Sequence, residues 1–197
     1  MDLNGSNTLQ NLARAFAGES QAATRYHFYQ KAAQQDGHQT IATIIQEIIR
    51  NELAHGKVFF DHIIKGGLRA EQLKNIIIGA GYPFQMGASA DNLLFSMQAE
   101  QEEHANIYPN FAQTAKQEGF AAVAASFEMI AQIEGLHQNI FQQMHEQLTQ
   151  NTLYQKEQAV SFKCAECGHV RQSKDAWSIC PVCHYPQGFV ELDIQLK

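Results

Sequence analysis

The sequence predicts an all-α fold, a four-helix bundle with one long crossover, followed by a small metal-binding domain. Four stretches repeat apolar residues at spacings of three and four, which is typical of helices that bury one face. Between the second and third stretches, residues 66–88 contain several glycines and a proline, so a continuous helix is not expected there. All the cysteines follow the last helical stretch. We therefore expect the bundle in residues 1–150 and a linker with the metal domain in residues 151–197.

Length and charge exclude several classes of protein. The 197 residues can bury a large core without disulfides, and the net charge of −6 argues against a nucleic-acid-binding surface. No run of about 18 apolar residues is present, so no membrane span is expected. The N-terminal residues lack the basic and apolar pattern of a signal peptide. We expect a cytoplasmic protein whose cysteines bind metal rather than form disulfides.

The first two helices are expected at residues 7–35 and 39–65. Ser6 and Asn7 are suitable N-caps, and glycines follow the end of each helix. Glu19 interrupts the apolar stripe of the first helix, and Glu52 and His55 interrupt that of the second. An ionised carboxylate in an apolar interior is unfavourable unless it is paired, neutralised or bound to metal. These three positions are therefore candidates for metal ligands.

The third helix is expected from residue 89 or 91 to about residue 119. Glu100 and Glu103 fill the gap in its apolar stripe. Pro109 lies inside this helix and should kink it or remove one backbone hydrogen bond. The preceding segment has room for a short helix at residues 70–78, and its length suits a crossover between parallel helices.

The fourth helix, residues 123–148, repeats the pattern of the second. Its stripe contains Glu134 and His137, and a Glu-x-x-His spacing directs both side chains toward one point. Glu19 precedes Glu52 by 33 residues, and Glu100 precedes Glu134 by 34. This internal repeat predicts two similar helix pairs, related by an approximate twofold axis, around one central site.

The central site has the ligand set for two metal ions. A Glu from each of two helices, with Glu-x-x-His from each of the other two, is the pattern of paired iron or manganese sites, although zinc can also be bound. A single core Glu or His is usually satisfied by local hydrogen bonds, but several in register with a repeat favour the metal interpretation. The candidate ligands are Glu19, Glu52, His55, Glu100, Glu134 and His137.

Four nearby residues each allow two interpretations. Glu103 is either a seventh ligand or a solvated member of an acidic run. His104 is rotated away from the ligand face, so we expect it behind the ligands or at the surface. Tyr26 and Tyr108 either donate hydrogen bonds to ligating carboxylates or are core tyrosines with their hydroxyls at the rim.

The cysteines form two Cys-x-x-Cys knuckles, which predict a tetrahedral sulfur site for one metal ion. Spacing alone leaves zinc and iron as alternatives. Residues 149–161 are polar and are expected to be a linker that is either irregular or partly helical or extended, and the metal should supply much of the folding energy of the short segment that follows. The cysteines are Cys164, Cys167, Cys180 and Cys183, and the aromatic residues expected to form the small core are Phe162, Trp177, Tyr185 and Phe189.

These motifs resemble those of the rubrerythrin family, and the resemblance covers essentially the whole chain. It lies in the FAGESQA and RY segments of residues 16–26, ELAH at 52–55, EQEE at 100–103 followed by YP at 108–109, EGLH at 134–137, and the cysteine knuckles. It implies a ferritin-like bundle with a di-iron site and a rubredoxin-like Fe(Cys)4 domain. It also favours iron over zinc at the cysteines.

The resemblance implies a role for each ligand of the bundle. Glu52 and Glu134 would bridge the two irons, Glu19 and Glu100 would bind terminally, and His137 would bind one iron.

The resemblance also identifies residues expected to take part in catalysis. His55 and Glu103 would exchange as ligands of the other iron when its oxidation state changes. Tyr26 and Tyr108 match positions next to the ligands.

The activity implied by the resemblance is a non-haem di-iron peroxidase that reduces hydrogen peroxide to water. Electrons would pass one at a time through the Fe(Cys)4 centre, from a reductase that uses reduced pyridine nucleotide or from a small redox protein. A homodimer is expected, with the cysteine domain of one subunit near the di-iron site of the other. Two alternatives are an iron-handling ferroxidase and a non-catalytic bundle with a structural zinc ribbon.

Overall fold

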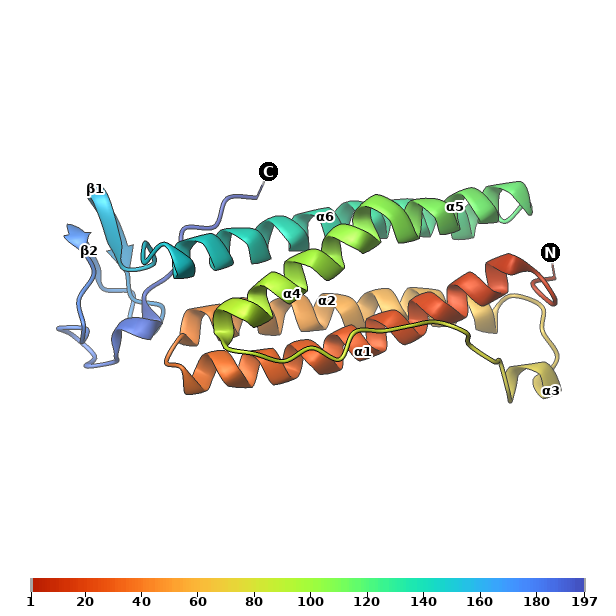
Figure 1. The fold of residues 1–197 in the computed structure, drawn as a ribbon, viewed down its shortest axis with the longest axis horizontal. Helices are drawn as coiled ribbons and strands as arrows, with labels where there is room; N and C mark the ends of the chain where they lie inside the picture. The colour runs from red at the N-terminus through yellow and green to blue at the C-terminus, as the bar shows by residue number, and fades with distance from the viewer. Residues whose placement is uncertain (1, 197) are drawn as a thin grey trace.

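The computed structural model describes residues 2–196, which form a long helical bundle with a small sheet-containing domain at one end (Figure 1). The helices are α1 (Asn7–Gln35), α2 (Gln39–Ile64), α3 (Ala70–Leu73), α4 (Ser89–Glu102), α5 (Tyr108–Gln117) and α6 (Ala121–Thr149). A π-helical turn (Glu103–Ile107) separates α4 from α5. The C-terminal domain contains β1 (Gln155–Lys163), β2 (Val170–Asp175) and a 3-10 turn (Gln187–Phe189). Within residues 2–196, no helix has the length and apolar character needed to cross a membrane.

The ends of α1 and α2 lie where the sequence predicts them. The Ser6 side chain accepts a hydrogen bond from the Leu9 amide and caps α1. Gly37 follows with a φ of +85°, a left-handed conformation that glycine adopts without steric cost, and the chain reverses into α2.

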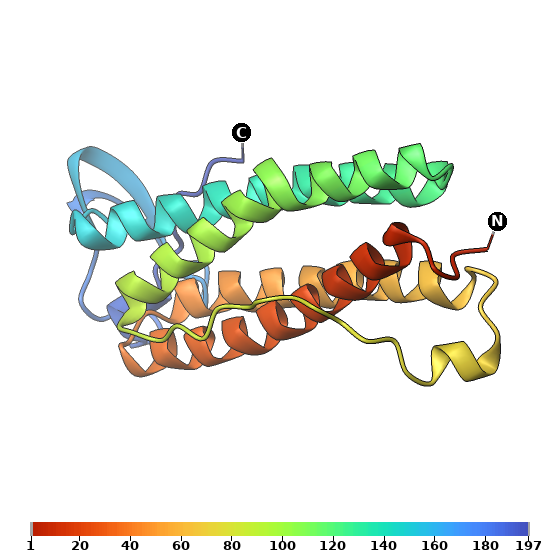
Figure 2. The ribbon, with the colours of Figure 1, turned by 45° about the vertical axis from the view of Figure 1, so that its right-hand side comes forward.

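The crossover, residues 66–88, runs along the outside of α1 in both views (Figures 1 and 2). The Tyr82 hydroxyl donates to the carbonyl of Arg14 (2.8 Å), and the Tyr29 hydroxyl donates to the carbonyl of Gln85 (2.6 Å). These bonds fix the crossover over the first helix. Its short helix, α3, ends at Leu73 and is shorter than the predicted 70–78.

The predicted third helix is divided into two parts, and the division begins before Pro109. The amide of Tyr108 bonds to the carbonyl of Glu103, five residues back, so the turn between them is wider than an α-helical turn. Pro109 has no N–H to offer the carbonyl of Ala105, and the helix adapts in the turn that precedes the proline. The sequence predicted the disturbance but placed it at the proline itself.

The bundle core consists of two apolar clusters with the candidate ligands between them. One includes Phe59 and Phe127, and the other includes Ile45, Phe141 and Met144. In both α2 and α6 the Glu-x-x-His residues lie between the parts of the helix that contribute to each cluster.

The C-terminal domain packs on the end of the bundle. The Thr40 hydroxyl in α2 donates to the carbonyls of Gly188 (3.0 Å) and Val190 (2.8 Å). β1 begins at Gln155, so the connection after α6 is shorter than the predicted linker, residues 149–161. The prediction for Tyr185 was wrong: this side chain is 39% exposed, while Phe162 and Trp177 are buried with Val190.

Candidate metal centres

The candidate ligands of the bundle are deeply buried although all are ionisable. Glu19, Glu52, Glu100, Glu134 and His137 are each at most 2% exposed, and His55 is 6% exposed. They come from α1, α2, α4 and α6, because each occupies the core-facing position that its apolar stripe would otherwise give to a hydrophobic residue.

These residues form two overlapping groups. Glu19, Glu52, His55 and Glu134 place ligand atoms within 4.8 Å of one another, and so do Glu52, Glu100, Glu134 and His137. Glu52 and Glu134 belong to both groups. A carboxylate has two oxygens, so each of these two residues can contact two cations at once.

Unpaired ligand atoms show that the site fits two metal ions. Among the described residues, both carboxylate oxygens of Glu52 and Glu134 are buried without a hydrogen-bond partner, as are the Nδ1 atoms of His55 and His137. The His137 Nδ1 lies 2.7 Å from Glu134 Oε2, and the His55 Nδ1 lies 2.9 Å from Glu134 Oε1. Although these atoms are close, their angles do not suit hydrogen bonds. Cations between the oxygens and nitrogens would satisfy all of them.

The charges of the site also favour cations. Burial, followed by repulsion from Glu52 and Glu134, raises the pKa of Glu19 and Glu100 well above the usual value. For Glu52, burial is outweighed by contacts with the two histidines, which lower its pKa to about 2. At His137 burial is outweighed by contacts with Glu134 and then Glu52, which raise its pKa to about 10. The carboxylates therefore favour positive charge at the centre of the site.

Two tyrosines hold carboxylates of the opposite helix pair. The Tyr26 hydroxyl in α1 donates to Glu100 Oε1, and the Tyr108 hydroxyl in α5 donates to Glu19 Oε1. Of the two interpretations that the sequence allowed, the structure has the hydrogen-bonding one. Each bond orients a carboxylate while its other oxygen, Oε2, remains unpaired.

Glu103 lies beside the site but outside both groups. It begins the π-helical turn and is half-buried, and its Oε1 faces Gly18 in α1. Burial, then the charges of Glu134 and Glu52, raise the pKa of Glu103 well above the usual value. His104 points elsewhere, since its Nδ1 lies 2.7 Å from the carbonyl of Ala131 in α6.

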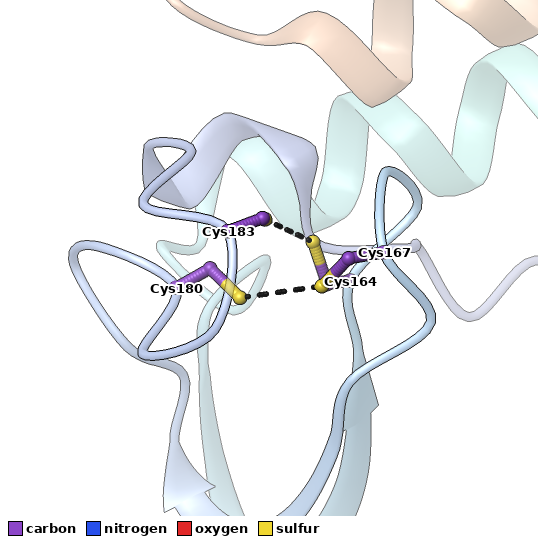
Figure 3. A group of neighbouring side chains, drawn as sticks. All are labelled: Cys164, Cys167, Cys180 and Cys183. Carbon is purple, nitrogen blue, oxygen red and sulfur yellow. Dashed lines mark hydrogen bonds between the residues drawn. The ribbon is translucent and has the colours of Figure 1, made fainter.

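The four cysteines come from two loops and face one another (Figure 3). The Sγ atoms of Cys164 and Cys183 are 3.7 Å apart, as are those of Cys167 and Cys180. Disulfide sulfurs lie about 2.05 Å apart. In a tetrahedron with metal–sulfur bonds of about 2.3 Å, the sulfurs lie about 3.8 Å apart. The cysteines are therefore spaced for one metal ion.

Some residues around the bundle site carry no signal in the sequence. The side-chain amide of Asn51 lies 3.2 Å from His137 Nε2 and leaves Nδ1 facing the carboxylates. Gly18 and Tyr82 lie next to Glu103. Asn51 occupies a solvent-facing helix position and Tyr82 lies in a loop, so the sequence does not distinguish these two from ordinary surface residues, whereas Gly18 lies within the FAGESQA segment.

Comparisons with known proteins agree with this geometry. The family model described as rubrerythrin matches residues 10–145. The chain is 38% identical to Rubrerythrin-1 of Clostridium acetobutylicum over 190 residues, which cover 96% of each chain. It is 34% identical to the rubrerythrin of Nitratidesulfovibrio vulgaris over 193 residues, which cover 96% of each chain.

Solved structures show a similar fold. A structure of fully reduced nigerythrin has a TM-score of 0.62 and 22% identity, and the match covers 98% of this chain and 92% of the nigerythrin chain. A bacterioferritin from Desulfovibrio desulfuricans has a TM-score of 0.65 and 18% identity, covering 74% and 81%. The two structures share the ferritin-like bundle fold.

Proposed function

Because the chain belongs to the rubrerythrin family, we propose that it is a non-haem di-iron peroxidase that reduces hydrogen peroxide to water. The observation that carries the proposal is the pair of overlapping ligand groups that share Glu52 and Glu134. Shared carboxylates keep two metal ions close enough to act on one small substrate.

Rubrerythrins are di-iron proteins of oxidative-stress defence that carry a di-iron site and a rubredoxin-like Fe(Cys)4 site. The donor sets of this chain suit both, since carboxylates with imidazoles bind iron in the bundle and four thiolates bind one iron in the knuckles. When bound, the reduced iron pair supplies two electrons to the O–O bond together, and the cysteine-bound iron supplies single electrons to restore it.

We propose that the protein residues divide the work at the bundle site. Glu52 and Glu134 would each hold both metal ions, and Glu19 and Glu100, oriented by the tyrosine hydroxyls, would each hold one. His137 belongs to the group of Glu100.

The other group, which contains Glu19 and His55, is the one that Glu103 approaches. We propose that Glu103 would hold the metal ion of this group in place of His55 when the oxidation state of that ion changes. The raised pKa of Glu103 supports this role, because a carboxylate destabilised by nearby negative charges gains from moving onto a cation.

We further propose a cytoplasmic homodimer in which electrons cross between subunits. Thr40 bonds to Val190, which pairs with Cys164, and Thr40 lies twelve residues before Glu52 on the same helix. At 1.5 Å per residue this places the two centres of one chain roughly 18 Å apart along α2. We propose that the cysteine domain of a partner subunit would lie nearer to the bundle site than this. The electrons would come from a pyridine-nucleotide-dependent reductase or a small redox protein.

Anaerobic reduction followed by titration with peroxide tests the function. We expect each peroxide molecule to remove two electrons, so that three peroxide molecules reoxidise the three irons in each of two chains, and both centres should show this in the optical spectrum. Reaction with dioxygen and free ferrous ion, but not with peroxide, would support a ferroxidase instead. A cysteine site that binds only zinc in protein made without added zinc would rule out the electron relay.

Replacement of Glu103 tests the ligand exchange. Glu103→Ala should keep its iron but slow the reoxidation by peroxide at least about tenfold, as expected for the loss of a ligand at the reacting metal. Glu47→Ala is the matched control, because Glu47 is an exposed acid of α2 that lies 3.9 Å from exposed Arg50 and lines neither the metal site nor the cavities beside it. Equal rates in both variants would return Glu103 to the solvated-residue interpretation.

A further inference from the structure

We propose that a cavity between the crossover and the π-helical turn is the route by which peroxide reaches the bundle centre. We further propose that Tyr82 and Gly18 limit its width, so that hydrogen peroxide passes and bulky organic hydroperoxides do not. The proposal rests on the peroxidase function above. The cavity has a volume of about 270 Å³, and its walls come from α1, the crossover, the end of α4, the π-helical turn and α5.

The inner wall of this cavity is part of the metal site. It includes Glu103 and Tyr108, whose hydroxyl donates to Glu19. It also includes Gly18, the residue before Glu19. A molecule in the cavity is therefore separated by one side chain from Glu19, a carboxylate of the ligand group that also contains His55.

The outer rim of the cavity is polar and open to solvent. Glu102, Asn106 and Asn110 lie on it and are exposed. Hydrogen peroxide both donates and accepts hydrogen bonds, so it can exchange water contacts for contacts with these side chains.

Tyr82 and Gly18 form the narrow part between the rim and the ligands. The Tyr82 hydroxyl is tied to the carbonyl of Arg14 (2.8 Å), so the ring is held against α1. A Cβ atom added at Gly18 would lie 3.7 Å from Tyr82 Cε1 and 3.9 Å from Glu103 Oε1. The absent side chain of Gly18 thus leaves a gap of about one methyl group between the ring and the carboxylate.

A second cavity reaches the site from the other side of α1 and provides the competing route. It has a volume of about 300 Å³ and is lined by Glu52 together with Phe16, Leu53 and Phe60. Apolar surface dominates its lining, as it does in the first cavity, but Glu103 does not contribute to it. We therefore assign entry to the cavity at Tyr82, and the second cavity supplies the control.

The test compares Gly18→Ala and Tyr82→Ala with Leu53→Trp, which adds bulk at the second cavity. Gly18→Ala should fold well, because the new methyl makes only ordinary van der Waals contacts and alanine has a higher helix propensity than glycine. We expect it to slow reoxidation of the reduced protein by hydrogen peroxide at least about tenfold. Tyr82→Ala should speed the reaction with cumene hydroperoxide about tenfold. Tyr82→Phe keeps the ring, so its reaction with cumene hydroperoxide should be as slow as that of the wild-type protein.

Binding of azide to the oxidised protein gives a readout that is independent of peroxide chemistry. Gly18→Ala should slow the appearance of the azide spectrum without changing its final form, and Leu53→Trp should do neither. If wild-type protein binds azide but does not react with peroxide, the proposed peroxidase function is refuted, and the rates of azide binding still test the route. The route is overturned if Leu53→Trp slows azide and peroxide while Gly18→Ala leaves both unchanged.

Discussion

Replacing Gly188 by alanine should release the C-terminal domain from the bundle without unfolding either part. A Cβ atom at this position would lie 1.8 Å from the carbonyl oxygen of Gly37, which belongs to the turn between α1 and α2. Carbon and oxygen rarely approach closer than about 3.3 Å, so the two backbones would have to separate by about 1.5 Å. Flexible side chains cannot relieve this clash, because the obstructing atom is backbone.

The cost of this separation follows from the contacts that it breaks. The Thr40 hydroxyl lies 3.0 and 2.8 Å from the carbonyls of Gly188 and Val190 and shares its single proton between them, and a shift of 1.5 Å breaks this hydrogen bond. The loss is about 1 kcal/mol. The ratio of docked to undocked domain should therefore fall about fivefold.

Limited proteolysis in the connection of residues 150–154 measures this ratio. Gly188→Ala should be cut much faster than wild-type protein, while the optical spectrum of its metal-loaded cysteines stays the same. Gly79→Ala is the control, because a Cβ atom there has no neighbour within 4 Å. Equal cleavage of the two variants would refute the assigned contact.

Three further predictions concern the bundle. Tyr108→Phe leaves an oxygen of Glu19 unpaired, and metal titration should show about 10- to 100-fold weaker binding. Gly135→Ala places a Cβ atom 3.0 Å from the His104 ring, so the melting temperature should fall despite the helix preference of alanine, and His104→Ala should restore it in the double variant. The metal-free bundle should lose stability as pH rises from about 6.5 to 10. Folding raises the pKa of His137 to about 10 and raises that of Glu19, so the folded state binds more protons than the unfolded state over this range. Melting temperatures of metal-free and metal-loaded protein, measured at several pH values, should differ most at alkaline pH.

The helix ends could be predicted because they depend on local chemistry. Ser6 caps α1 through its own side chain, and glycines at positions 37, 67 and 119 take the positive φ that ends a helix. The crossover could be predicted from its glycines, and the bundle itself from the buried stripes. These features confirm the predicted fold class. The division near residue 150 stays a prediction.

The parts that could not be predicted depend on contacts between distant segments. Tyr185 was placed in the small core because it is aromatic, but Val190 takes the place beside Trp177 and leaves Tyr185 exposed. Tyr82 could not be identified because its position beside the site depends on how the crossover packs against α1. The extent of β1 was obscured because its side chains are mostly polar and exposed.

The bundle site could be located because a charged residue at a buried helical position stands out from its neighbours. The structure brings the six stripe-breaking residues together as expected. Their individual roles stay predictions. Glu103 and the tyrosines were ambiguous because helical periodicity gives the face of a residue but not the partner of its polar atom.

The spacing of the internal repeat explains how the site keeps its approximate symmetry. Tyr26 lies seven residues after Glu19, whereas Tyr108 lies eight residues after Glu100. Each tyrosine nevertheless donates to the acid of the opposite half. The wide turn before Tyr108, closed by a bond to the fifth residue back, accommodates the additional residue. The difference between the spacings of 33 and 34 residues is therefore absorbed within one turn.

The same turn makes the two halves chemically different. Glu103 begins it, three residues after Glu100, and the corresponding position three residues after Glu19 is Ala22, a buried apolar residue. An additional carboxylate is thus available on one side of the site, next to the ligand group that contains His55. The entry cavity opens on that side too. A single widened turn therefore supplies both the spare carboxylate and one wall of the route that leads to it, so the first ligand group is the one expected to respond to the oxidant.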